Sequence, residues 1–489
     1  MSSFSHRLLG AQLSPAGPAL VAIDLGAESC RVSLLQWQQE KPRIAMVRRF
    51  ANAPQDHGAA GLRWNLNRIC GELEAGLRAC AELAPEGIAS IGVTGWAVDY
   101  VRLNSAGQPA APPFCYRDPR TQAAMEAVHA ILPANELYVL TGVQIQRLNT
   151  IYQLFADKRS GIADSAPWVN LPEYILHWLG APRIAEYTNA THTGLIDPER
   201  RQWSEEIFAA LGLNRAATPE LVFPGTALGP LRADLKQIPA FAGTQLVAPA
   251  CHDTASAIAG IPECAGNWVY LSSGTWSLVG TLLPDSLRTP QAFARGFTNL
   301  GAADGRVLFH RGIAGMWLLR QCMDAWKLQR AWSLEELIDG ARRIPSPDAS
   351  LDLDDPNLIP PGDMLGRINA QRKRQGLAPL PDGVQAAPHY AGLIFRSLAN
   401  RYAMLLSEIE LLTGRHPERI CVVGGGSRNQ YLNALTAKVT GMPIECCSVE
   451  SATLGNFAIQ WASLDKQDDR ASTQTITSKV SSLAEVQFL

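Results

Sequence analysis

No run of about 18–20 apolar residues, the length needed to cross a bilayer as a helix, occurs in the 489-residue sequence. The first 20 residues, MSSFSHRLLGAQLSPAGPAL, also lack the sustained apolar core of a signal peptide. We therefore expect a cytoplasmic protein without a membrane partner, and a flexible extension ahead of the first strand.

The sequence also lacks a strong charge of either sign, since its formal net charge is −2. No long-range field would recruit nucleic acid or anionic lipid, so any small substrate has to be held by local groups. None of the ten cysteines forms a C-x-x-C pair, and the histidines are scattered, so the spacing typical of zinc ligands is missing. Reduced thiols are the simplest account of these cysteines.

Two nucleotide-binding signatures are missing as well. The chain contains neither G-x-x-x-x-G-K-[ST], the mark of a P-loop, nor the dinucleotide fingerprint G-x-G-x-x-G. What the sequence does contain is a large apolar fraction, 47%, with 18% charged residues. Such a composition is typical of globular proteins, and the length predicts two or three domains.

Three segments share one pattern, in which a short apolar strand runs into a turn rich in Gly, Ser and Thr. In the first, a strand over 21–25 is followed by a turn over 26–29 and a returning strand over 31–35. The second repeats this pattern with strands over 268–271 and 276–282. In the third, a strand over 420–423 meets Gly424-Gly425-Gly426 and a helix from about 429 to 439. Two similar hairpins half a chain apart indicate two lobes of similar construction.

Between these markers strands alternate with helices, which predicts a mixed α/β fold. Residues 90–103 have the pattern of a strand pair, and residues 395–414 that of a long helix. The domain boundary is expected near Gly260-Ile261-Pro262. Residues 348–375 have the composition of an irregular insertion, and the polar tail after about residue 465 is expected to add little to the core.

Backbone N–H groups and hydroxyls in such turns can hold phosphate oxygens without a lysine, although each turn alone is more often a plain hairpin. The glycine triplet at 424–426 would let a planar base or ribose approach the backbone closely. Asp24 ends the first strand inside the apolar run VAIDLG. Its carboxylate either bonds the backbone of its own turn or faces the waters of a Mg²⁺ ion near the phosphates.

Asp253 follows a strand and precedes a short Ala-rich helix in the segment APACHDTASAIAG. At that position it suits the N-cap of the helix, with Ser256 three residues on. An aspartate there can also face a cleft and take a proton from a sugar hydroxyl during phosphoryl transfer. The neighbouring His252 could donate to a sugar hydroxyl, although a lone histidine is more often structural.

Five motifs in order, VAIDLGAESCRVSL, HDTASA, YLSSGTWSL, VVGGGSRN and VESATLGN, resemble those of the FGGY carbohydrate kinases over nearly the whole chain. The phrases GWAVDY, YRDPRT, LNTIYQL, EYTNAT and LSSGTWSL are similar to the rhamnulokinase branch in particular. The resemblance implies two ribonuclease-H-like (actin-like ATPase) domains, over 19–261 and 262–465, with ATP and sugar in the interdomain cleft. It also implies an ATP-dependent and Mg²⁺-dependent sugar kinase, a monomer or homodimer, whose substrate is a ketose such as L-rhamnulose.

The resemblance implies roles for individual residues. The general base would be Asp253. From its own position at the end of the first strand, Asp24 is the residue that we expect to serve the metal. The sugar would contact Ala97, with Asp99 nearby, and the triplet His252, Asp253 and Thr254. The ATP phosphates would contact the turn Ala27, Glu28, Ser29, Cys30 and Arg31 together with Thr275, and the adenosine would lie at Gly424, Gly425 and Gly426.

The sequence departs from the rhamnulokinase pattern at three positions. Ala97 stands in a turn that reads more like TWGVD in that branch, and Gly312 and Arg320 replace amide side chains that touch sugar and nucleotide. Losing an amide contact removes discrimination between hydroxyl configurations. The alternatives are therefore a kinase for another ketose or polyol, such as L-fuculose or xylulose, and a non-catalytic actin-like nucleotide sensor.

Overall fold

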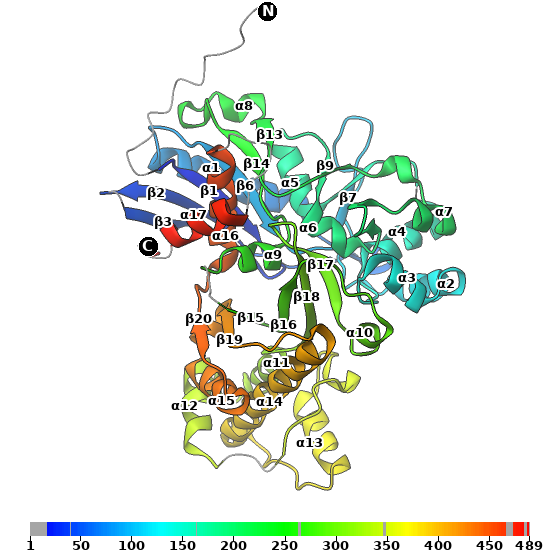
Figure 1. Ribbon diagram of the computed structural model, residues 1–489, viewed down its shortest axis with the longest axis vertical. Helices are drawn as coiled ribbons and strands as arrows, with labels where there is room; N and C mark the ends of the chain where they lie inside the picture. Colours follow the sequence, from blue (N-terminus) through cyan, green and yellow to red (C-terminus); the bar gives the residue numbers. More distant parts are fainter. Residues whose placement is uncertain are drawn as a thin grey trace, which may run out of the picture.

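The computed structural model describes residues 17–39, 41–162, 164–262, 266–345, 349–465, 473–483 and 487–488. The N-terminal extension that we expected, residues 1–16, lies outside these residues. Figure 1 shows an upper body built on one sheet and a lower body built on another, with the helix α9 (Asp253–Ala259) between them. Among the described residues, no helix combines the length and the apolar character that crossing a bilayer demands.

The upper body is built on a seven-stranded mixed sheet. Its strand order is β13-β14-β6-β1-β2-β3-β21, and β1, β6 and β14 run parallel to one another. The hairpin β1–β2 is antiparallel and pairs Asp24 with Arg31. The strands are β1 (Leu20–Leu25), β2 (Ser29–Gln38), β3 (Lys41–Ala51), β6 (Ser90–Gly95), β13 (Thr226–Pro230), β14 (Gln245–Ala248) and β21 (Gln487–Phe488).

The lower body repeats this plan with a six-stranded sheet in the order β17-β18-β16-β15-β19-β20. Here β15 and β16 form the antiparallel hairpin, while β19 and β20 add in parallel on the far side of β15, as β6 and β14 do beside β1. The two predicted hairpins are thus equivalent parts of two similar domains. The strands are β15 (Trp268–Ser273), β16 (Trp276–Leu283), β17 (Thr298–Gly301), β18 (Val307–Ala314), β19 (Arg419–Val423) and β20 (Ile444–Cys446).

Helices cover both sheets and fill the right-hand part of the upper body in Figure 1. Those before α9 are α1 (Leu66–Leu83), α2 (Thr121–Ile131), α3 (Ala134–Thr141), α4 (Thr150–Arg159), α5 (Leu171–Leu179), α6 (Tyr187–Ala190), α7 (Glu205–Leu211) and α8 (Ala233–Lys236). Those after α9 are α10 (Pro290–Ala294), α11 (Trp317–Trp326), α12 (Leu334–Arg343), α13 (Met364–Arg374), α14 (Ala387–Thr413), α15 (Gln430–Thr440), α16 (Ser451–Leu464) and α17 (Thr473–Leu483). Short two-stranded ribbons complete the upper body: β4 (Gln55–Asp56) with β5 (Leu62–Arg63), β7 (Tyr100–Arg102) with β8 (Trp168–Asn170), β9 (Ile184–Glu186) with β12 (Glu220–Val222), and β10 (Ile196–Asp197) with β11 (Gln202–Trp203).

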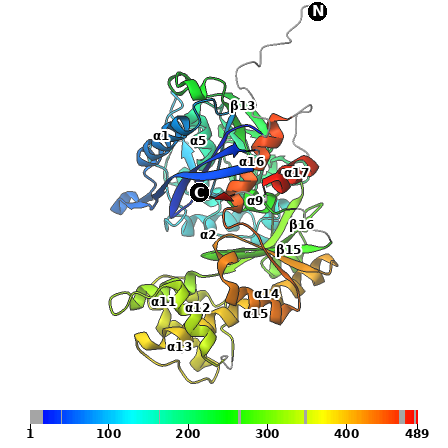
Figure 2. The same cartoon turned by 90° about the vertical axis from the view of Figure 1, so that its left-hand side faces the viewer.

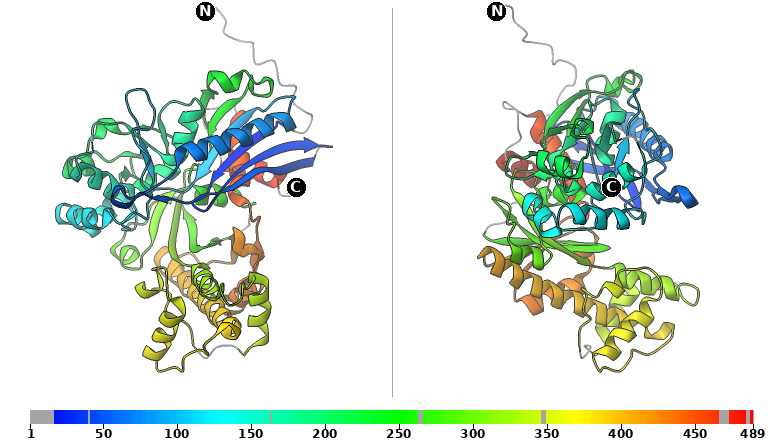
Figure 3. Two further views of the ribbon diagram at one scale, coloured as in Figure 1. Left: turned by 180° about the vertical axis from the view of Figure 1, so that it is seen from behind. Right: turned by 90° about the vertical axis from the view of Figure 1, so that its right-hand side faces the viewer.

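The helix α16, which follows the last strand of the lower sheet, returns to the upper body. It packs on β1 and β6 and against α9, whereas α1 contacts β2 and β3. Figure 2 shows α16 beside the upper strands, and the view from behind in Figure 3 shows α1 across the back of the same sheet. Gln460 fixes this packing, because its amide donates to the backbone oxygen of Val21 and accepts from Ser90. The expected boundary near Gly260–Pro262 stays a prediction, and α16 crosses back over it.

Of three local predictions, the first was confirmed only in part and the other two were wrong. Residues 90–103 do form two strands, but β6 pairs with β1 and β14 while β7 pairs with β8. Residues 348–375 are not an irregular insertion, since they contain α13 and buried leucines of the lower core. The tail adds to the core as well, because Ile476, Val480 and Leu483 of α17 are buried against α16 and its neighbours.

Candidate active site

The candidate residues of the upper body meet at the carboxyl ends of β1, β6 and β14. These parallel strands end at Leu25, Gly95 and Ala248, and backbone hydrogen bonds continue their alignment beyond the sheet. The amide of Gly95 donates to the Cys251 oxygen at 2.8 Å, and the amide of Trp96 donates to the Leu25 oxygen at 3.2 Å. Ligands of open α/β sheets bind at this edge. The turn after Asp24, the GWAVD segment and the CHD segment are therefore neighbours.

Asp253 does not cap its helix, so that interpretation of the sequence was wrong. His252 occupies the N-cap position, where no side-chain cap hydrogen bond forms, and Asp253 is the first residue of α9. Its carboxylate instead accepts hydrogen bonds from the hydroxyl of Thr254 at 3.1 Å and lies 3.3 Å from Nε2 of His252. The side chain keeps 38% of its surface exposed, which leaves it open to a substrate.

Although 38% of its side chain is exposed, desolvation by the surrounding protein raises the pKa of Asp253 to about 7, and the negative charge of Asp24 also raises it. A carboxylate with this pKa is matched to proton abstraction at neutral pH. Since two carboxylates of one cleft disfavour each other's charge, both become easier to ionise when a cation is present. The geometry therefore suits Asp253 to the role of a general base.

Asp24 lies at the end of β1 and is 7% exposed. Burial is the largest cause of its raised pKa, which the positive charge of Arg31 partly offsets and the charge of Glu450 reinforces. Arg31 donates to Asp24 at 2.9 Å and to Glu450 at 3.2 Å. One guanidinium thus pairs with two carboxylates. The carboxylate oxygens that Arg31 does not contact are hard donors of the kind that Mg²⁺ prefers.

Most side chains of the turn between β1 and β2 are exposed or half-buried, and Cys30 is the exception. Cys30 is buried in the core, with its thiol directed to the Gly26 oxygen. The hydroxyl of Ser29 accepts from Arg49, and Asn52 donates to the Gly26 oxygen. Gly26 itself is required, because a Cβ there would overlap the carbonyl oxygen of Ser29. Of Ala27 to Arg31, Cys30 can therefore offer only its backbone to a phosphate.

The lower body contributes the turn at Thr275 and the glycine triplet. Gly426 packs so closely on Ser273 of β15 that a Cβ would overlap its hydroxyl, while Gly425 is exposed with open space where a Cβ would lie. The triplet thus joins β15 to β19 through one glycine and leaves an uncovered backbone at another. This is the arrangement that close approach of a flat ligand needs.

A pocket of about 430 Å³ opens beside Thr275. Its walls come from α11 and the segment leading into α12, and they combine apolar side chains such as Met316 and Trp332 with the charged Arg320. Arg320 reaches across to the upper body, where its guanidinium lies 3.1 Å from the carboxylate of Glu28. Arg320, one of the three positions that depart from the rhamnulokinase pattern, thus lines this pocket and links the two bodies. Gly312 is exposed on β18 beside Leu278.

The GWAVD turn is strained and tightly held. Val98 has φ +73°, a conformation that a β-branched residue rarely adopts, and it costs about 1–3 kcal/mol. Two donors from α4 hold it, since Thr150 and Gln153 both bond to the Val98 oxygen. Ala97, which precedes this strained residue, is buried at 9% exposure.

Asp99 anchors that turn from below. It is fully buried, and its Oδ2 accepts from the indoles of Trp64 at 2.6 Å and Trp96 at 2.9 Å. Burial raises its pKa to about 6, which these hydrogen bonds partly offset. Because its described partners are protein donors, Asp99 acts on the site by positioning the turn.

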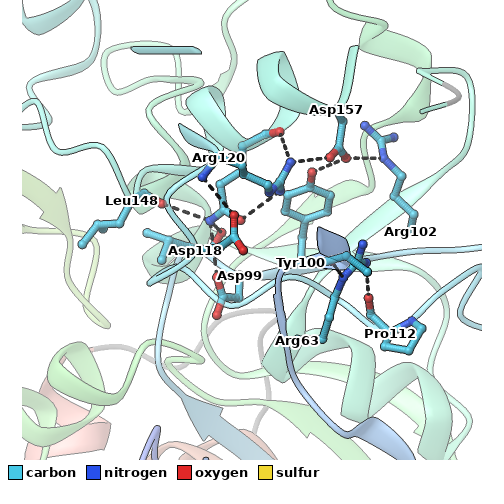
Figure 4. A network of polar contacts seen from close by, with 12 residues as sticks. Arg63, Asp99, Tyr100, Arg102, Pro112, Asp118, Arg120, Leu148 and Asp157 are labelled. Carbon is cyan, nitrogen blue, oxygen red and sulfur yellow. Dashed lines mark hydrogen bonds and ion pairs between the residues drawn. The ribbon is translucent and has the colours of Figure 1, made fainter. Parts of the chain in front are cut away.

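A second layer of charged groups lies behind Asp99 (Figure 4). Asp157 of α4 accepts from Arg102 at 2.7 Å and from Arg120 at 2.6 Å, and the hydroxyl of Tyr100 also donates to it. Burial and the charge of Asp157 raise the pKa of Tyr100. This network fixes β7 to α4, and thereby the turn that precedes β7.

The sequence analysis missed two residues beside Asp253. Glu186 accepts the backbone N–H of Cys251 at 2.8 Å and so holds the CHD segment, and burial raises its pKa to about 8. His192 places Nε2 3.1 Å from Nδ1 of His252. Glu186 is the first residue of the EYTNAT phrase, and His192 directly follows that phrase. The sequence analysis used the phrase only for the resemblance and assigned no role to either residue.

Comparisons with known proteins agree with this arrangement. A family model described as the N-terminal domain of the FGGY family of carbohydrate kinases matches residues 19–260, and its C-terminal counterpart matches residues 269–464. The chain is 33% identical to a rhamnulokinase of Enterococcus faecalis, over 93% of this chain and 91% of that protein. It is 35% identical to a rhamnulokinase of Yersinia pestis, over 92% and 91%.

Solved structures share the fold at low sequence identity. A xylulose kinase from Rhodospirillum rubrum superposes with a TM-score of 0.74 at 14% identity, covering 94% of this chain and 92% of that one. A Plasmodium falciparum glycerol kinase with ADP gives a TM-score of 0.72 at 15% identity, with coverage of 94% and 92%.

Proposed function

The chain belongs to the FGGY family of carbohydrate kinases, and on that premise we propose that it transfers the γ-phosphate of ATP to L-rhamnulose, giving L-rhamnulose 1-phosphate. The relatives at 31–35% identity that carry the name rhamnulokinase support this choice of sugar. The observation that carries the proposal is the carboxylate of Asp253, which does not cap its helix, is open to a substrate and has a pKa raised to about 7.

In this proposal Asp253 takes the proton of the attacking sugar hydroxyl as the oxygen approaches the γ-phosphorus. The sugar lies against Ala97, His252 and Thr254, while Asp99 holds the GWAVD turn from behind. Closure of the two bodies aligns hydroxyl and phosphate and excludes water, which limits hydrolysis of ATP.

The nucleotide would lie between the two hairpins. The backbone of Ala27–Arg31 and Thr275 holds the phosphate oxygens, and the exposed backbone of Gly425, between Gly424 and Gly426, receives the adenosine. The pocket beside Thr275 supports a ligand on the Thr275 side of the cleft, since it combines apolar and charged walls next to that turn. Asp24 would hold Mg²⁺, which when bound neutralises charge on the phosphates.

The pH dependence follows from the same carboxylate. Since only the ionised form of Asp253 accepts a proton, kcat/KM should rise with pH and level off above about 7, near the raised pKa. The check is a pH profile of kcat/KM for the sugar at saturating MgATP. The residual activity of Asp253→Asn should lack this limb, and an identical limb in that variant would assign the titration to another group.

The sugar is tested by comparing kcat/KM for L-rhamnulose, L-fuculose and xylulose with MgATP. We expect L-rhamnulose to exceed the others by about tenfold or more, the range that one or two contacts of a sugar pocket provide. Because Gly312 has no amide side chain to contact the sugar, the ratio of kcat/KM values between L-rhamnulose and the other sugars should stay near this lower value. A higher value for xylulose or L-fuculose would replace the sugar and leave the kinase chemistry in place.

A further inference from the structure

Two histidine side chains lie in a row that ends at the proposed base. Nε2 of His192 lies 3.1 Å from Nδ1 of His252, and Nε2 of His252 lies 3.3 Å from Oδ1 of Asp253. The two imidazole rings are 3.9 Å apart between centroids and tilted by 55°. His252 is 6% exposed, so its ring has little contact with solvent.

The backbone holds both histidines in place. The amide of His252 donates to the hydroxyl of Thr188 in α6, and the oxygen of His192 accepts from the side chain of Asn149. The segment of His192 is also tied to the lower body, since Thr191 accepts from the amide of Gly301. The close approach of the two rings is therefore built into the fold.

The pKa values of both rings favour the neutral form. Burial lowers the pKa of His192 to about 3, and burial together with the neighbouring His192 and His310 lowers the pKa of His252 well below its usual range. A neutral imidazole has one N–H and one lone pair, so each ring can donate through only one nitrogen. On each ring the nitrogen without the proton can therefore only accept.

The carboxylate of Asp253 favours one of the two tautomers of His252. It can serve as a base only when ionised, and an ionised carboxylate accepts hydrogen bonds without donating any. An N–H on Nε2 of His252, 3.3 Å from the ionised oxygen, is favoured over a lone pair there, and Nδ1 then becomes the acceptor. Among the described residues, an N–H on Nε2 of His192 satisfies that acceptor across 3.1 Å.

We infer that His192 is a positioning residue, which locks His252 in the Nε2–H tautomer and so keeps an N–H donor directed at the catalytic carboxylate and at a sugar hydroxyl beside it. This inference rests on the proposed function for its effect on turnover. Without the His192 donor, Nδ1 of His252 can take the proton, and Nε2 then turns a lone pair toward Asp253. That arrangement repels the ionised base and removes the donor from the sugar.

Replacement of His192 tests the inference through kinetics. His192→Leu should lower kcat by about tenfold or more, with smaller changes in the KM values for sugar and ATP. His192→Gln retains an N–H at the end of its side chain and should recover most of the lost kcat. His416→Gln, at an exposed site far along the chain, serves as the control and should match the wild type. Equal losses in the Leu and Gln variants, or a change confined to KM, would overturn the inference.

The tautomer itself can be observed without any sugar. In the ¹⁵N-histidine-labelled protein at pH 8, the His252 ring should couple as a neutral imidazole protonated at Nε2, and His252→Asn assigns its signal. In His192→Leu the Nδ1-protonated form should appear. A wild-type ring protonated at Nδ1 would overturn the inference even if L-rhamnulose is phosphorylated. A chain that phosphorylates no ketose would still give the tautomer result, so the two failures are distinguishable.

Discussion

Asp253→Asn should lower kcat for sugar phosphorylation by about 10²–10⁴-fold, the usual contribution of a general base. The substitution preserves shape and removes the oxygen charge that accepts the proton. Binding of MgADP should change little, because the phosphate turns and the pocket beside Thr275 lie on other segments. The measurement is steady-state kinetics combined with calorimetric titration of MgADP.

The same variant should not be less stable than the wild type. Burial raises the pKa of Asp253, so the ionised carboxylate opposes folding once the pH exceeds its unfolded-state pKa, and the loss is complete above about 7. A neutral amide avoids this cost, and the thermal midpoint at pH 8 should stay equal or rise. Asp382→Asn, at an exposed site of the lower body, is the matched control and should leave both rate and midpoint unchanged. Full activity in Asp253→Asn would remove Asp253 from the chemistry.

Gly455→Ala should damage both stability and rate, because α16 crosses α9 through glycines. A Cβ at Gly455 would overlap the carbonyl oxygen of Ser256, and a Cβ at Gly260 would overlap that of Ser451. Backbone cannot yield as a flexible side chain does, so we expect a loss of about 1–3 kcal/mol in the free energy of unfolding. Since α9 begins at Asp253, a displacement of the helix by about 1 Å should also lower kcat by about a hundredfold.

Gly71→Ala separates this contact from a general effect of alanine. Gly71 lies within α1, and nothing lies within 4 Å of the position of its Cβ. Alanine there should be neutral or slightly stabilising, because it favours the helix. Denaturant unfolding and kcat of both variants make the comparison. If Gly455→Ala behaved like Gly71→Ala, the α9–α16 contact would not position the base.

The repeated hairpins and the glycine triplet could be predicted from the sequence because their turns depend on local residue types. The chain around 24–31 and around 272–276 carries the glycines and hydroxyls that such turns need, and the strands fell within a few residues of their predicted bounds. The position of α16 could not be predicted in this way. Its glycine contact with α9 and its Gln460 contacts with β1 and β6 join residues hundreds of positions apart.

The site was predicted less completely than the fold, for physical reasons. The local sequence suited Asp253 to the N-cap of α9. The helix begins one residue earlier than that, with His252 at the N-cap, so the carboxylate of Asp253 does not cap the helix. The strain at Val98 is invisible in the sequence, because only the surrounding hydrogen bonds make that conformation tolerable. His192 was missed because its partner, His252, lies 60 residues away, although a histidine beside the EYTNAT phrase was a signal to weigh.

The most direct measurement of the central claim is the rate of ADP release from MgATP with and without L-rhamnulose. The account predicts a low rate with ATP alone and an increase of about a hundredfold or more on adding the sugar, because only a bound hydroxyl next to Asp253 completes the reaction geometry. The increase should vanish in Asp253→Asn. An ADP release rate that no ketose raises above the ATP-alone value would contradict the account.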